Sequence, residues 1–157
     1  MSKFIVQTVC VHGRLDPVGD GVALADGVAG RDSDHDVRER AAGRLTETQA
    51  PHLDVFSIMP YHARFGHAGD PAWMSRQTAK LGKLLGLRGE PGEKKFIWPI
   101  VQSSDWGERV PVSEIPEIIR HGLKAPATGV MTFAWSGIAK EWPKVDAIGQ
   151  AYREVRR

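Results

Sequence analysis

Residues 96–106 read FIWPIVQSSDW, an apolar run of strand-forming side chains that ends in polar ones. Two similar runs lie on either side of it along the chain, DVFSIM at residues 54–59 and GVMTFAW at residues 129–135. These runs are apolar on both faces, which is typical of strands in a parallel sheet that helices cover. The sequence therefore predicts three buried parallel strands between about residue 52 and the end of the chain.

An amphipathic segment follows each run, so each strand is expected to lead into a helix. The expected inward-facing side chains are Trp73, Gln77, Leu81, Leu84 and Leu85 in the first helix, Ile115, Ile118, Ile119 and Leu123 in the second, and Val145, Ile148, Tyr152 and Val155 in the third. The strands start roughly 30 to 40 residues apart, close to one strand–helix repeat. The pattern predicts an α/β fold, a partial (β/α)8 (TIM) barrel of three to four βα units. Pro99 lacks a backbone donor, so the middle strand is expected to bulge there or to begin at Ile100.

The first third of the chain differs in composition from the rest. No aromatic residue lies between Gly13 and Ala50, whereas all five tryptophans lie at or beyond Trp73. Residues 1–51 are therefore interpreted as an irregular segment with one strand at residues 4–11 and a polar helix at residues 37–48. Residues 52–157 are interpreted as the βαβαβα part. A long insertion loop or a truncated product would show the same contrast in composition.

Composition excludes several classes of protein. The 157 residues carry a formal charge of +2, and their basic side chains are scattered, so nucleic acid is not an expected partner. Cys10 is the only cysteine, which excludes an internal disulfide and a Cys-rich zinc site. No secretion signal or membrane span is visible, so a cytoplasmic location without membrane contact is expected. No cofactor is implied, because no dinucleotide, P-loop or metalloprotease motif is present.

Polar and aromatic residues follow each predicted strand. Tyr61, His62 and Arg64 come after the first strand. Gln102, Asp105 and Trp106 come at the end of the second strand, and Trp135 ends the third. Ligand sites of parallel α/β folds gather beyond the carboxyl ends of the strands. Aromatic rings beside hydrogen-bonding groups suit a sugar, whose C–H face packs on a ring while its hydroxyls need polar partners.

The order DVFSIMPYH, FIWPIVQSSDW and GVMTFAWSGI, followed by a terminal helix, resembles the C-terminal portion of a TIM-barrel glycoside hydrolase or a hydrolase-like relative. The resemblance covers about two-thirds of the chain. It implies that Trp135 lies beneath a bound sugar and that Tyr61, His62 and Gln102 line the pocket.

The chain departs from that family where a catalytic glutamate is expected, because the position is occupied by Gln102 and the residues after it. Glycoside hydrolysis usually needs two carboxylates about 5 to 10 Å apart. Asp105 is the best candidate for a catalytic carboxylate and Glu108 a poorer one. A second carboxylate would have to come from the first third of the chain or from strands that this chain lacks. Whether the chain is an enzyme is therefore left open.

Two alternatives stand beside the hydrolase. One is a non-catalytic module that binds a sugar or another small molecule, and the other is a half barrel without activity of its own, whose open edges pair with a second copy. Plainer roles also stand for individual residues. Trp98 and Trp135 would serve in the core, Tyr61 and His62 would complete a turn, and Asp105 would cap its loop.

Overall fold

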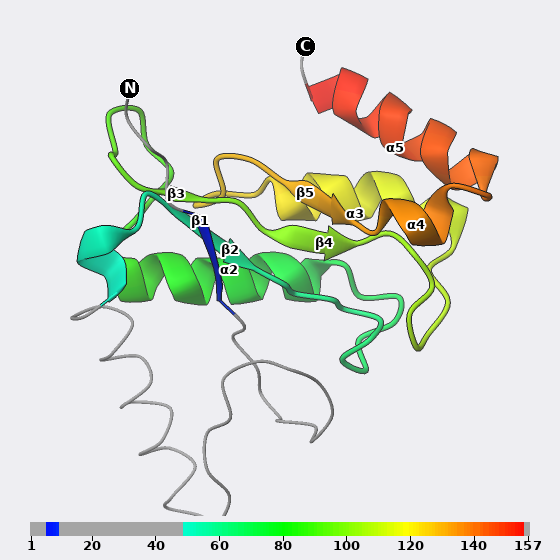
Figure 1. Ribbon diagram of the computed structural model, residues 1–157, viewed down its shortest axis with the longest axis horizontal. Helices are drawn as coiled ribbons and strands as arrows, with labels where there is room; N and C mark the ends of the chain where they lie inside the picture. Colours follow the sequence, from blue (N-terminus) through cyan, green and yellow to red (C-terminus); the bar gives the residue numbers. More distant parts are fainter. Residues whose placement is uncertain (1–5, 10–48, 156–157) are drawn as a thin grey trace, which may run out of the picture. The chain divides into compact units, whose positions relative to one another are not determined.

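The computed structural model describes residues 6–9 and 49–155 of the chain. Its strands are β1 (Val6–Val9), β2 (Val55–Ile58), β3 (Phe96–Ile97), β4 (Ile100–Gln102) and β5 (Met131–Phe133). Its α-helices are α2 (Ala72–Leu85), α3 (Ile115–Gly122), α4 (Trp135–Ile138) and α5 (Trp142–Val155), with 3-10 turns at Ala50–His52 and Val112–Glu114 (Figure 1). The helix predicted at residues 37–48 lies outside the described residues.

All strand pairing is parallel among the described residues. β2 lies between β1 and β3 in a three-stranded sheet, and β4 pairs with β5. Every residue of β2 is buried. This agrees with the predicted position of the run DVFSIM as a strand covered on both faces.

Pro99 divides the predicted strand at residues 96–102 into β3 and β4. Before the proline, the N–H of Trp98 donates to the carbonyl of Phe56 at 3.0 Å, on the β2 side. At the proline, the N–H of Met131 donates to the Pro99 carbonyl at 2.9 Å, on the β5 side. The carbonyl of Pro99 thus accepts a hydrogen bond in the strand pairing, although proline has no backbone N–H to donate one. The break expected at this residue is confirmed, since β4 begins at Ile100.

The predicted partial (β/α)8 barrel is wrong. The described strands form one three-stranded and one two-stranded parallel sheet in a small mixed α/β domain, without the regular strand–helix repeats of a barrel. Apolar runs do not report how far hydrogen bonding extends between strands. Nor is every run buried, since β5 has no buried residue and Phe133 is 36% exposed. Pairing stops at Pro99, and the run at residues 129–135 pairs over only three residues before Trp135 begins α4.

The main core surrounds α3, which contacts α2, β4 and α5 and lies between the two other helices (Figure 1). Ile115, Ile118 and Ile119 are fully buried, as their spacing predicts. At Gly122 a Cβ atom would stand 2.6 Å from Cγ2 of Val130 and 2.9 Å from a γ-carbon of Val101. A glycine is therefore what lets the end of α3 approach β4 and the segment before β5.

Helix α2 ends as predicted, but its buried face is different. It stops at Gly86, whose φ of 68° lies in the left-handed region that glycine adopts without strain. The buried side chains include Met74, Thr78 and Leu81, whereas Leu84 is 39% exposed. The predicted inward face is therefore wrong at Leu84.

Among the described residues, 6–9 and 53–155 belong to one compact unit. In the part of the chain that the structure describes, none of the helices combines the length and the apolar character needed to cross a membrane.

Candidate functional site

Tyr61 anchors a group of aromatic rings beyond the ends of β2, β4 and β5. It is buried, and its ring centroid lies 5.5 Å from that of Trp106 and 5.2 Å from that of Phe133. Trp106 and Phe133 also contact each other, at 5.6 Å between centroids. Trp106 is 45% exposed and Phe133 is 36% exposed. The buried tyrosine thus supports two rings that solvent reaches, and we call Trp106 and Phe133 the aromatic surface.

Trp135 is a more exposed ring that follows Phe133 by two residues. It begins α4 and is 64% exposed. No contact with another described aromatic ring involves Trp135, and most of its surface is accessible to a ligand. The alternative role in the core is wrong for Trp135, because a core side chain would be buried.

Arg64 places its guanidinium group over the aromatic surface. Its Cζ lies 5.1 Å from the ring centroid of Trp106, within the range of a cation–π contact. Its backbone N–H donates to Oε1 of Gln102 at 3.0 Å. These two contacts hold the loop after β2 against the loop after β4.

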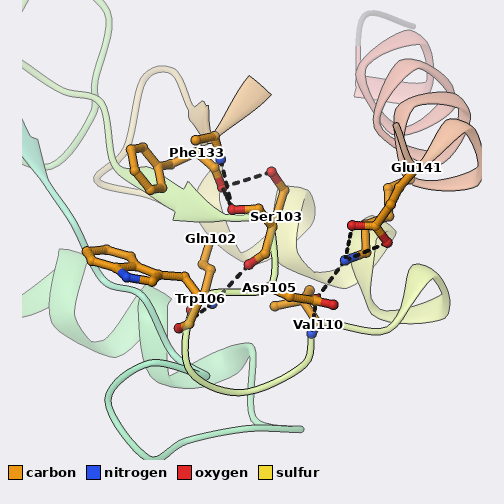
Figure 2. Close-up of polar contacts among 10 residues, drawn as sticks. Gln102, Ser103, Asp105, Trp106, Val110, Phe133 and Glu141 are labelled. Atoms are coloured by element: carbon orange, nitrogen blue, oxygen red, sulfur yellow. Dashed lines mark hydrogen bonds and ion pairs between the residues drawn. The ribbon is translucent and has the colours of Figure 1, made fainter. Parts of the chain in front are cut away.

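Gln102 uses its whole side-chain amide to hold these loops. Besides accepting from Arg64, it donates through Nε2 to the carbonyls of Ser104 and Trp106, at 3.0 and 3.3 Å. Figure 2 shows the amide directed into the loop after β4. Since it is fully buried with both ends bonded, Gln102 supports the site and does not offer a free group to a ligand.

Two serines join the ends of β4 and β5. The backbone N–H of Ser103 donates to the Phe133 carbonyl at 2.7 Å, and its Oγ donates to the same oxygen at 3.0 Å (Figure 2). The Oγ of Ser104 accepts from the N–H of Ala134 at 3.2 Å. These bonds fix the position of Phe133 relative to Trp106.

Asp105 turns away from the rings and contacts α5. Its Oδ1 accepts from Nζ of Lys144 at 2.7 Å and from the N–H of Val110 at 2.8 Å. Nζ of Lys144 also lies 3.2 Å from Oε2 of Glu141. Figure 2 shows Asp105 and Glu141 on one side of Gln102 and the Trp106 ring on the other. Asp105 and Glu141 thus contact the same nitrogen atom, which keeps their carboxylates close together.

The surroundings of Asp105 favour its carboxylate form. Burial alone would raise the pKa of Asp105, but the hydrogen bonds from Lys144 and from Val110 outweigh it and hold the pKa below its ordinary value. The Lys144 side chain is only 2% exposed, whereas that of Asp105 is 44% exposed. Asp105 is therefore an ionised group that also caps its own loop through Val110.

His62 lies beneath the site and does not reach its surface. It is fully buried, and its Nε2 lies 3.2 Å from Oε1 of Glu114. Burial lowers the pKa of His62, and the neighbouring Glu114 offsets this only in part. Nδ1 is buried and has no hydrogen-bond partner. A neutral imidazole is therefore the favoured form.

The structure brings Tyr61, Arg64, Gln102 and Trp106 together. The carboxylate of Asp105 instead points away from them, toward Lys144. Sequence reasoning missed Phe133, Glu141 and Lys144. Phe133 sits inside an apolar run, which indicates burial. Lys144 lies in the first turn of α5 and Glu141 directly before it, among other charged residues, a pattern typical of a solvated face.

No cluster of three or more metal-binding side chains occurs within the described ranges. No protein-family model, curated protein or solved structure matches this chain.

Proposed function

We propose that this domain binds a carbohydrate on the aromatic surface and does not hydrolyse it. The observation that carries the proposal is the pair of exposed rings, Trp106 and Phe133, supported from below by the buried Tyr61. A sugar packs its C–H face on such a ring and leaves its hydroxyls at the rim for polar groups. Trp135, which is 64% exposed and follows Phe133 by two residues, would offer a second ring of the ligand a further contact.

Preorganisation supports this proposal. The loops that carry Arg64 and Trp106 are tied together by Gln102, and Phe133 is tied to β4 through Ser103. A ligand would therefore meet rings already held in place and would lose less affinity to ordering of the protein.

Hydrolysis is the second candidate function, and Glu141 is the observation that favours it. It supplies a second carboxylate near Asp105, because both carboxylates contact Nζ of Lys144, and glycosidases use two carboxylates about 5 to 10 Å apart. However, catalytic carboxylates flank the bond to be cleaved, and these two instead point at one ammonium group. Asp105, held as a carboxylate, would also not donate the proton that the leaving group needs.

The test is a titration of the full chain with neutral and acidic oligosaccharides, followed by tryptophan fluorescence, with released reducing sugar measured in the same wells. We expect saturable binding without release. Trp106→Ala should weaken binding about tenfold or more, since one sugar–ring contact would be lost. Trp142→Ala is the control, because Trp142 is also an exposed tryptophan, 66% accessible, and lies at the start of α5.

Each outcome decides between the candidates. Release of sugar that Asp105→Asn abolishes would establish hydrolysis and overturn the binding-only proposal. A folded, monodisperse chain that responds to no saccharide would overturn the carbohydrate assignment altogether.

A further inference from the structure

Arg64 is a cation at the aromatic surface that lacks a carboxylate partner. Three other arginines, at positions 76, 88 and 120, lie against Asp70, Glu90 and Glu117 respectively. Arg64 forms no ion pair with the residues that the structure describes, and its side chain is exposed. Its guanidinium donors are therefore available at the place where a ligand ring would pack.

Two contacts and a glycine position this side chain. The backbone of Arg64 is bonded to Gln102, and its Cζ lies over Trp106. Gly107 provides the space, because a Cβ there would stand 3.3 Å from both Cδ and Nη1 of Arg64. With a φ of 88°, Gly107 also adopts a backbone conformation that side chains disfavour. An exposed arginine whose backbone is bonded and whose guanidinium group lies on an indole has lost part of the side-chain freedom that binding would otherwise restrict.

The charges around Arg64 leave it free to act on a ligand. Asp105 is turned toward Lys144, as described above. Glu108 and Arg109 follow in the same exposed loop, and neither forms an ion pair with a described residue. The carboxylate nearest along the chain to Trp106 is thus already neutralised by a buried ammonium group.

We propose that the ligand carries a carboxylate, which the Arg64 guanidinium binds while the ligand ring packs on the aromatic surface. This inference rests on the proposed function and names its ligand class as an acidic saccharide, such as a uronic-acid oligomer. A guanidinium group presents parallel N–H donors that match a carboxylate, and its flat face can remain on the indole while its edge binds.

The experiment compares two tetrasaccharides with the full chain, β-1,4-linked glucuronate and β-1,4-linked glucose, which differ only in carboxylate against hydroxymethyl at C6. Binding is measured by calorimetry and by tryptophan fluorescence at low and high salt. We expect the glucuronate oligomer to bind roughly tenfold more tightly, as one charge-assisted pair predicts, and to lose this advantage at high salt.

Three variants distinguish an effect of the Arg64 guanidinium group from an effect of positive charge in general. Arg64→Gln should bind both tetrasaccharides equally, and Arg64→Lys should recover only part of the preference, because an ammonium group lacks the paired donors. Arg88→Gln removes one exposed positive charge from the turn before β3 and should keep the full preference.

Equal affinity for the two tetrasaccharides in the parent, or an undiminished preference in Arg64→Gln, would overturn this inference while leaving carbohydrate binding in place. Failure of both tetrasaccharides and of the wider oligosaccharide panel to bind a folded chain would overturn the proposed function and this inference with it.

Discussion

Lys144 places an ammonium group inside the domain between two carboxylates that stay in contact with solvent. Its side chain is 2% exposed, while Asp105 and Glu141 are each more than two-fifths exposed. The free-energy cost of removing a partner therefore differs between the carboxylates and the ammonium group. A carboxylate left alone can be hydrated, whereas the buried ammonium cannot.

This difference predicts an asymmetry between variants. Lys144→Met removes the buried charge and keeps the aliphatic stem, so we expect a loss of about 1 to 2 kcal/mol in unfolding free energy. The double variant Asp105→Asn/Glu141→Gln leaves the ammonium buried among neutral amides, and we expect a larger loss of about 3 to 5 kcal/mol. Urea denaturation of both variants at neutral pH measures the two losses. A greater loss in Lys144→Met than in the double variant would contradict this account.

The candidate site was predictable from sequence at some residues and not at others. Tyr61, Arg64, Gln102 and Trp106 follow predicted strand ends, and parallel pairing brings such ends to one edge. The orientation of Asp105 was not predictable, because its partner Lys144 lies 39 positions away in a helix whose charges indicate a solvated face. A buried salt bridge leaves no periodic signal in the sequence.

At the scale of whole elements, prediction succeeded where the apolar spacing was unambiguous. Helix α3 has isoleucines at positions 115, 118 and 119, which can share only one face, and all three are buried. Helix α2 offers several leucines near its end together with Met74 and Thr78, so more than one face fits the pattern. Its Thr78 is buried because its hydroxyl donates to the Met74 carbonyl at 3.0 Å, a local bond that hydropathy does not report.

The contact of α3 with β4 and the segment before β5 gives a prediction about Gly122. Alanine favours helices over glycine by about 1 kcal/mol, yet we expect Gly122→Ala to destabilise the domain, because its Cβ would meet Val130 and Val101 at under 3 Å. Val130→Ala alone creates a small cavity and should also destabilise. The double variant should be more stable than the sum of the single losses predicts.

A double-mutant cycle from thermal or urea denaturation measures this coupling. Gly149→Ala in α5 is the control, since the nearest side-chain atom to its Cβ would be the far end of Arg153, at 3.3 Å. Additive losses for Gly122→Ala and Val130→Ala would show that the two sites do not touch as described.

For the molecule as a whole, folding lowers the pKa of each described imidazole or carboxyl group whose pKa is shifted. Burial lowers the pKa of His62 and of His121 below the ordinary value of 6.5. For Asp105, hydrogen bonds from Lys144 and Val110 outweigh burial and lower the pKa, and hydrogen bonds from Arg76 and Arg120 lower the pKa of Asp70 and Glu117. The unfolded chain thus takes up these protons more readily than the folded chain.

Stability should consequently fall with pH in two windows. A group with a lowered folded pKa contributes stability above its unfolded pKa and loses it as the pH falls through the folded value. We therefore expect one decrease in unfolding free energy below about pH 6.5, from the two histidines, and a second below about pH 4, from the carboxyls. Denaturant titrations across this range measure both. In the variant His62→Gln/His121→Gln the first decrease should shrink while the second remains, and His52→Gln, which alters an exposed histidine, should keep both. If the unfolding free energy of the double variant fell as steeply below about pH 6.5 as that of the parent, the first decrease would not arise from these two imidazoles.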